Sequence, residues 1–383
     1  MTVYISRGEW QAVRRAGFLT FAIGSIIFGL TVAGCAGSGR TTTTTAPAGT
    51  NTTTASSTDA TVTPATHMVK KMAVVAPEVA KDFGWNQQGV ESARKVAAEI
   101  GAEIEVADGA GYEDITPLLR ELAQGGSNLT IAFASGYGTS AVQQAQELKV
   151  PHIIIGQFEK GNVPGLAQDI ETNAQNGAYL AGIVAAKTTK TGTVGIVMSA
   201  DDENWVKMAG GFVQGARSVK ADLKILMAQV GQAGYADAAG GKRVTESVIA
   251  GGADVIFGMG DGSSFGMIQA VETATPPKGA DKIWFIDVIG DKSSLDKKGV
   301  LLTSVVWDYS VAFKWAVDQL AAGTFGSEIY YLDVDNGGMD LLKTPYLSAE
   351  VMADVDTAKK GIIDGSIKVV ATETKADVEA MIK

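Results

Sequence analysis

Short apolar runs alternate with amphipathic stretches along the chain from Lys70 onward. Nine of the runs are β-rich, and we expect strands at 71–77, 103–108, 129–135, 152–158, 193–199, 223–230, 254–260, 283–289 and 301–307. Helical spacing of apolar residues predicts helices at about 87–99, 114–124, 138–148, 174–188, 204–219, 239–250, 264–274 and 309–322. Unbroken apolar strands that alternate with helices are typical of parallel sheets buried on both faces. The pattern therefore predicts an α/β fold with two doubly wound lobes.

The predicted strands end in residues suited to ligand contacts. Each strand except the last is followed by Gly, Ser, Asp or Pro, which places polar loops at the carboxyl edges where α/β sheets bind ligands. The loop GMGDGSSFG at 258–266 follows a strand and opens a helix, as a dinucleotide-binding loop would. Its glycine spacing departs from G-x-G-x-x-G, so we favour amides that face a ligand hydroxyl or anion over a nucleotide cofactor site. No cofactor is expected.

Composition narrows the function. A chain of 383 residues suggests two domains of ordinary size. The single cysteine cannot form an internal disulfide or a thiolate metal cage, and the two histidines lack a partner at helical spacing for a metal. A net charge of −10 without a dense basic stripe disfavours nucleic-acid binding. Because a GxSxG nucleophile elbow and other catalytic motifs are absent, we do not expect an enzyme.

The first 34 residues resemble an export signal. Arginines precede an apolar run at 16–32, and VAGC at 32–35 resembles the lipobox of bacterial lipoproteins. That resemblance implies removal of residues 1–34 and lipidation of Cys35, with an uncleaved membrane anchor as the alternative. Residues 35–67 then hold the lipidated cysteine and a Thr- and Ala-rich stretch. This stretch lacks the apolar side chains to offset its chain entropy, which predicts a disordered linker.

Several segments of the remaining chain occur in an order typical of one family. They include DFGWNQQG at 82–89, QNGAYLAGIVAA at 175–186, GGFVQGARSV at 210–219, GGADVIFGMGDG at 251–262, DNGGMDLL at 335–342 and AKKGIIDGSIKV at 358–369. Together they resemble the basic membrane protein family of lipoproteins, the purine-nucleoside receptors of ABC importers. The resemblance implies a type I periplasmic-binding-protein fold with two Rossmann-like lobes joined by three crossovers. It predicts an N lobe at 68–190 plus 309–333 and a C lobe at 191–308 plus 334–383.

The resemblance also indicates ligand-binding residues on the N lobe. Trp85 stands where the family usually has the phenylalanine that stacks on a purine, with core filling as the alternative. Asn86 matches a family asparagine and is suited to reading a ring edge. Asp82 either caps the following helix or faces the ligand, and Phe83 is a further aromatic at the same edge. The expected wall also includes Tyr137, Gln157 and Phe158.

On the C lobe, Trp205 is expected to form the second face of an aromatic sandwich, or else to pack on its own lobe. Asp261 and Asp287 resemble family positions that face ligand hydroxyls, although both are also suited to capping helices. Trp307 and Asp308 stand where the nucleoside receptors have a lysine. That exchange leaves room for a free purine base or another flat, neutral or cationic ring. Trp307 alternatively lines the hinge.

These features together predict a lipid-anchored solute receptor on the extracytoplasmic face of the bacterial cell membrane. It would capture a purine nucleoside or purine-like base by aromatic stacking and by carboxylate and amide hydrogen bonds. The resemblance implies ABC permease and ATPase subunits as partners, and we expect a monomer. A sensor of the same fold that signals to a membrane partner, or a receptor for another small solute such as a sugar, is the alternative.

Overall fold

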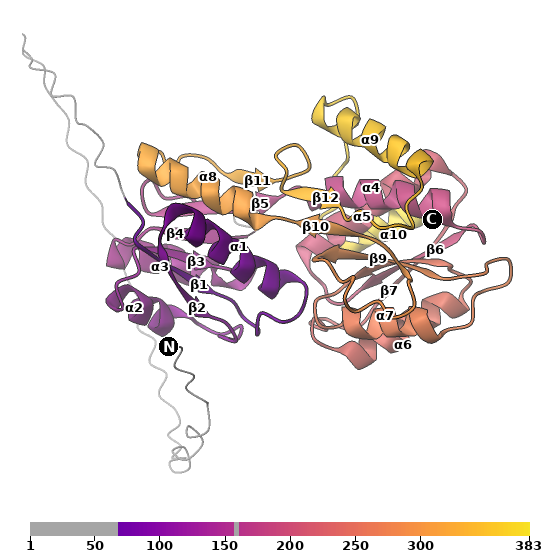
Figure 1. Ribbon diagram of the computed structural model, residues 1–383, viewed down its shortest axis with the longest axis horizontal. Coiled ribbons are helices and arrows are strands. Elements are labelled where there is room, and N and C mark those ends of the chain that lie inside the picture. Colours follow the sequence, from indigo (N-terminus) through magenta and orange to yellow (C-terminus); the bar gives the residue numbers. More distant parts are fainter. Residues whose placement is uncertain (1–67, 157–160) are drawn as a thin grey trace, which may run out of the picture. The chain divides into compact units, whose positions relative to one another are not determined.

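The computed structural model describes residues 68–156 and 161–383, which form two six-stranded sheets with surrounding helices (Figure 1). The first sheet has the strand order β11-β5-β4-β3-β1-β2, and its paired strands are parallel. Its strands are β1 (Lys71–Val75), β2 (Glu103–Ala107), β3 (Leu129–Ala132), β4 (His152–Ile155), β5 (Ala167–Thr172) and β11 (Tyr330–Leu332). The predictions for residues 1–67, including Cys35, and for Gln157 and Phe158 lie outside the described residues.

The second sheet has the order β12-β10-β9-β8-β6-β7. Its strands are β6 (Thr193–Met198), β7 (Lys224–Gln229), β8 (Val255–Met259), β9 (Trp284–Ile289), β10 (Leu301–Trp307) and β12 (Met339–Leu341). All its pairings are parallel except the edge pair of β10 with β12, which is antiparallel. The prediction of an α/β fold with parallel sheets is therefore confirmed.

Helices connect the strands at the predicted places. They are α1 (Trp85–Ile100), α2 (Thr116–Gln124), α3 (Gly138–Leu148), α4 (Ala174–Thr188), α5 (Glu203–Val219), α6 (Ala238–Ala250), α7 (Ser264–Thr273), α8 (Tyr309–Ala322), α9 (Ala349–Ile363) and α10 (Lys375–Ile382). A short 3-10 turn, η1 (Ser135–Tyr137), precedes α3. Helices α9 and α10 follow the last predicted element and were not expected.

Strand β1 shows why the chain winds helices on both faces of a sheet. Successive side chains of a strand point to opposite faces. Met72 and Val74 belong to the apolar cluster that contains residues of α1, whereas Ala73 and Val75 belong to the cluster that contains residues of α2 and α3. All four side chains are fully buried. A strand that is apolar at every position thus requires a cover on each face, which the two sets of helices supply.

Three segments join the two sheets. The chain passes from β5 to β6 through α4, returns from β10 to β11 through α8, and crosses again between β11 and β12. These are the three crossovers that the sequence analysis expected. Helix α4 packs on α5 and α9 and contacts strands of the second sheet. The exact lobe boundaries predicted above stay a prediction.

Helices α4 and α5 pack with their backbones almost in contact. A Cβ atom added at Gly215 would lie 1.9 Å from the carbonyl oxygen of Tyr179, and one added at Gly211 would lie 2.2 Å from that of Gln175. Heavy atoms cannot approach so closely, so this face of α5 requires residues without a side chain. The repeated glycines of GGFVQG therefore serve helix packing.

Strand β5 was missed because its sequence, AQDIET, is mostly polar. The strand is nevertheless buried along its length, and its residue Gln168 finds partners in the crossover after α8. Gln168 donates from Nε2 to the carbonyl oxygen of Glu328 at 2.7 Å, and its Oε1 accepts from the amide of Gly326 at 2.8 Å. A buried polar side chain costs little once it is hydrogen-bonded, and these partners are distant in the sequence.

Candidate functional site

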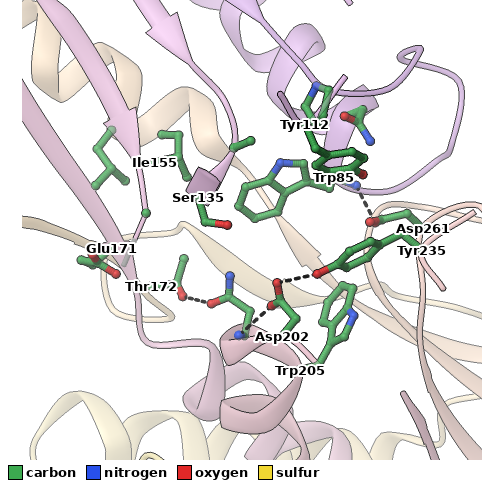
Figure 2. A pocket seen from close by; sticks show the side chains of 16 residues that line it. Trp85, Tyr112, Ser135, Ile155, Glu171, Thr172, Asp202, Trp205, Tyr235 and Asp261 are labelled. Atoms are coloured by element: carbon green, nitrogen blue, oxygen red, sulfur yellow. Dashed lines mark hydrogen bonds between the residues drawn. The ribbon is translucent and has the colours of Figure 1, made fainter. Parts of the chain in front are cut away.

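A cavity lies among the loops that follow the carboxyl ends of the strands in both sheets (Figure 2). It encloses about 640 Å³ of empty space, its open mouth included. Residues that follow or end strands of the first sheet form one side: Pro77, Trp85, Asn86, Tyr112, Ala134, Ser135, Ile155, Gly156, Ile170, Glu171 and Thr172. Residues that follow strands of the second sheet form the other side: Asp202, Asn204, Trp205, Tyr235 and Asp261. This is the position where α/β sheets bind ligands.

Trp85 begins α1 and presents its half-buried indole to the cavity. Its ring packs on Phe133, with centroids 4.6 Å apart, and meets Tyr309 edge to face at 5.7 Å. The indole Nε1 donates to the carbonyl oxygen of Phe133 at 3.2 Å. These contacts hold the ring in one orientation, so that a flat surface faces the cavity at little further cost in side-chain entropy.

Asn86 also lines the cavity, but protein groups engage both ends of its amide. Its Oδ1 accepts from the amide of Glu78 at 3.1 Å, and its Nδ2 donates to Asp82 Oδ2 at 2.8 Å. Asp82 further accepts from the backbone amides of Gly84, Asn86 and Gln87. Of the two roles considered for Asp82, helix capping fits these contacts, because its carboxylate accepts from backbone amides at the start of α1. Asp82 is buried and does not line the cavity.

Trp205 faces the cavity from the first turn of α5. The helix begins with Asp202, whose Oδ1 accepts from the amide of Asn204 at 2.9 Å, a standard N-cap. The indole Nε1 of Trp205 donates to Ser199 Oγ at 2.9 Å, which fixes the ring. The structure thus brings Trp85 and Trp205 to one cavity from elements of different sheets (Figure 2).

Asp261 connects the two sides of the cavity. It follows β8, and its Oδ1 accepts from the backbone amide of Trp85 at 2.9 Å (Figure 2). A Cβ at Gly84 would lie 2.4 Å from that oxygen, so only glycine permits this approach. Burial, followed by the nearby carboxylate of Asp82, raises the pKa of Asp261 to about 8. The carboxyl group therefore holds its proton near neutral pH in the ligand-free protein.

Two further predicted residues, Tyr137 in η1 and Asp287 in β9, are buried away from the cavity. Tyr137 is 1% exposed and donates its hydroxyl to the carbonyl oxygen of Gly111. Asp287 is fully buried, accepts from Ser264 Oγ at 3.0 Å and lies 3.4 Å from Lys292 Nζ. Neither residue lines the cavity. Burial, only partly offset by Lys292, raises the pKa of Asp287.

The remaining predicted residues also lie outside the cavity lining. Phe83 meets Phe265 edge to face at 6.1 Å. Trp307 is 2% exposed and lies behind Trp85, with ring centroids 6.3 Å apart. Asp308 caps α8 through the amide of Ser310 and pairs with Lys95 at 3.0 Å. A role of these residues in ligand contact stays a prediction. In the structure, Trp307 packs against the ring of Trp85.

Sequence reasoning missed two tyrosines at the cavity. Tyr112 follows β2, Tyr235 follows β7, and their rings stack with centroids 6.3 Å apart and an interplanar angle of 19°. Tyr112 donates to Glu78 Oε1 at 2.9 Å and Tyr235 to Asp202 Oδ2 at 3.0 Å. Because both tyrosines follow strand ends, the sequence could have indicated each as a residue near the ligand. The contact between their rings depends on how the two sheets are arranged, which hydrophobic periodicity does not encode.

The cavity is acidic and aromatic. Asp202, Asp261 and Glu171 supply carboxyl groups to its lining, whereas none of its described lining residues is Lys, Arg or His. Thr172 and Asn204 contribute polar groups and bond to each other at 2.6 Å across the cavity floor. The described part of the chain holds no group of His, Cys, Asp and Glu side chains suited to a metal ion. Such a lining suits binding by stacking and by acceptance of hydrogen bonds.

Comparison with known proteins identifies the family. A family model described as ABC transporter substrate-binding protein PnrA-like, or Bmp, matches residues 69–373. The chain belongs to the Bmp family. Its members are substrate-binding proteins of ABC transporters and not enzymes, and they act outside the cytoplasm. The resemblance seen in the sequence is thereby confirmed. Within 68–156 and 161–383, no helix combines the length and apolar character that crossing a membrane requires.

Individual proteins that are similar to this chain include members of the Bmp family and solved solute-binding proteins. The chain is 32% identical to the ABC transporter nucleoside-binding protein BmpA of Lactococcus lactis subsp. cremoris over 202 residues, which are 50% of this chain and 57% of that relative. It is 24% identical to basic membrane protein D of Borreliella burgdorferi over 78% of this chain and 87% of that protein. A solved structure of ABC transporter system solute-binding proteins from Aeropyrum pernix K1 matches with a TM-score of 0.68 at 17% identity, over 81% of this chain and 96% of that one. The type I periplasmic-binding-protein fold is thus confirmed.

Proposed function

We propose that this substrate-binding protein is lipid-anchored and delivers a purine nucleoside or a purine-like base to an ABC permease. The observation that carries the proposal is the convergence of Trp85, Trp205 and the Asp261 carboxyl group on one cavity. A flat heteroaromatic ring gains about 0.5–1.5 kcal/mol from stacking on an indole, beyond the area that it buries. The printed name of the Lactococcus lactis relative, a nucleoside-binding protein, supports the same ligand class.

In the proposed complex the ring stacks on Trp85, with Trp205 on the opposite side of the cavity. Asp261 meets the ligand through Oδ2, because Oδ1 already accepts from Trp85. Asn86 lies at the cavity edge, where its hydrogen bonds to Glu78 and Asp82 hold the start of α1 in place. No bond is made or broken, so release depends on separation of the two sides of the cavity.

Anchoring by Cys35 and contact with a permease and an ATPase belong to the same proposal. The VAGC sequence at 32–35 supports lipidation, and a lipidated N-terminus with two or more acyl chains holds a protein stably on a membrane. The Bmp family supports the importer, since its members are substrate-binding proteins of ABC transporters.

Titration calorimetry of the purified protein with nucleosides, free purine bases and sugars tests the ligand class. Heat is expected with the nucleosides or the bases and not with ribose or glucose. Heat with sugars alone overturns the purine proposal.

The variant Trp85→Ala tests the stacking surface. It should weaken binding by about tenfold or more, because stacking and the buried ring area are both removed. Trp284→Ala is the matched control, since Trp284 contacts Tyr346 and Lys282 outside the cavity and should leave the affinity unchanged. An equal affinity of Trp85→Ala and the unaltered protein would assign Trp85 to the core.

A further inference from the structure

The charge of the cavity restricts its ligand more than its shape does. Its described lining includes the carboxyl groups of Asp202, Asp261 and Glu171 and no Lys, Arg or His. A phosphate or carboxylate of a ligand would therefore find no cationic partner among the described lining residues.

Asp261 has an oxygen that the protein leaves open to a ligand. The residue is 6% exposed and lines the cavity. Its Oδ1 accepts from the amide of Trp85, whereas no described residue donates a hydrogen bond to Oδ2. This oxygen is therefore available to a ligand group that carries a proton or a positive charge, and a charge-assisted hydrogen bond there is stronger than a neutral one.

The aromatic residues present ring faces rather than donors. The hydroxyls of Tyr112 and Tyr235 donate to Glu78 and Asp202, and the indole nitrogens of Trp85 and Trp205 donate to Phe133 and Ser199. Their polar groups are therefore occupied. What the two indoles still offer a ligand is π-electron density, which attracts cations and does so most strongly for Trp.

We propose that the ring bound in this cavity carries a positive charge and lies against Asp261 Oδ2 between the indoles of Trp85 and Trp205. The inference rests on the proposed function and narrows it to flat heteroaromatic cations such as N-alkylated purine nucleosides. Nucleotides and other anionic purines are excluded by the same lining.

Proton release is the signature of this charge. The groups that face Asp261 are Asp82 and Glu78, which raise its pKa, and Lys292, which lowers it, while Tyr112 and Tyr235 stay neutral. Near neutral pH the carboxyl group is protonated, because burial and Asp82 raise its pKa to about 8. A bound cation stabilises the ionised carboxylate, so close to one proton leaves for each ligand that binds.

The experiment compares adenosine, its cationic derivative 1-methyladenosine, adenosine monophosphate and the non-purine cation 1-methylnicotinamide by calorimetry. It uses two buffers with different ionisation enthalpies near neutral pH. We expect 1-methyladenosine to bind about tenfold or more tightly than adenosine, with proton release, and the monophosphate not to bind. Asp261→Asn should bring the two nucleosides to similar affinities and abolish the proton release. Asp281→Asn, which removes one exposed acidic charge outside the cavity, should keep the preference.

The outcomes separate the two proposals. Equal affinities for adenosine and 1-methyladenosine would overturn the charge inference and leave the nucleoside receptor standing. Binding of 1-methylnicotinamide without binding of any purine would support the charge and overturn the purine ligand, and binding of none of these probes would overturn both. If Asp261→Asn does not fold, the unaltered protein carries the test, and tighter binding of 1-methyladenosine without proton release would contradict the inference.

Discussion

At the residue scale, Asp261 combines two tasks that would conflict on a single oxygen atom. One carboxyl oxygen accepts from the Trp85 amide across the cavity, and the other is open to the ligand. Gly84 makes this possible, because any side chain there would occupy the place of Oδ1. The backbone contact positions Asp261 beside the ring that the ligand is proposed to stack on.

The raised pKa of Asp261 predicts a pH dependence of stability. The folded protein keeps the proton up to about pH 8, whereas the unfolded chain releases it near its ordinary pKa of 3.8. The folded state therefore binds more protons in this window, and the free energy of unfolding falls as the pH rises from about 4 to about 8. Asp261→Asn should remove this part of the slope and stabilise the ligand-free protein at alkaline pH.

Urea unfolding of both proteins at several pH values across that window measures the effect. Other buried carboxyl groups contribute to the slope of each protein, so the difference between the two curves isolates Asp261. Asp281→Asn should follow the unaltered protein, and parallel curves for Asp261→Asn and the unaltered protein would contradict the prediction.

At the element scale, the contact of α4 with α5 is one of the two closest helix approaches that the glycine positions define, the other being that of α6 with α7 at Gly266. Helix α4 carries the chain from one sheet to the other, and α5 presents Asp202 and Trp205 to the cavity from its first turn. The packing of Gly215 against the backbone of Tyr179 therefore positions one wall of the site.

Gly215→Ala should destabilise the protein by about 1–3 kcal/mol, because the added methyl group overlaps the carbonyl oxygen of Tyr179. Helix propensity alone would favour alanine over glycine by about 1 kcal/mol. The sign of the change in unfolding free energy therefore shows whether the steric overlap outweighs the helix propensity. Chemical denaturation measures it. Gly231→Ala, where a Cβ meets nothing within 4 Å, is the control. A gain in stability for Gly215→Ala would show that the helices separate without cost.

At the scale of the whole molecule, several contacts join the side of the first sheet to the side of the second. Tyr112 stacks on Tyr235, Phe83 meets Phe265, Asp261 accepts from Trp85, and Thr172 donates to Asn204. Three of these four contacts involve residues of the cavity lining. A ligand bound in the cavity would also contact residues of both sheets. We therefore expect ligand binding to favour the state in which the two sides of the cavity are in contact.

The proposed lipid anchor is tested on the whole protein in its bacterial host. Cys35→Ser should move the protein from the membrane to the aqueous phase on detergent partition, because two acyl chains are needed for stable anchoring. Mass spectrometry should find the lipid on Cys35 of the unaltered protein, and Ser38→Ala should remain anchored. Retention of Cys35→Ser in the membrane would favour the uncleaved anchor.

The sequence by itself determined the family and most of the elements, but not β5, β11, β12, α9 and α10. Unbroken apolar runs allow little else than buried parallel strands, and helical spacing placed α1 to α8 because both periodicities are local properties of the chain. The mostly polar β5 escaped this reasoning, since its burial depends on partners after α8. Trp85 and Trp205 were accessible as aromatics at strand ends.

Only the tertiary structure decided which side chains share the cavity. Tyr137, Asp287 and Trp307 lie within, at the end of or soon after strands of the two sheets, yet they are buried away from the cavity. Tyr112 and Tyr235 meet although their sequence positions give no sign of contact. The direction of a loop side chain depends on which neighbours compete for burial and hydrogen bonds around it. Those neighbours come from both sheets, so the composition of the site emerges when the sheets come together.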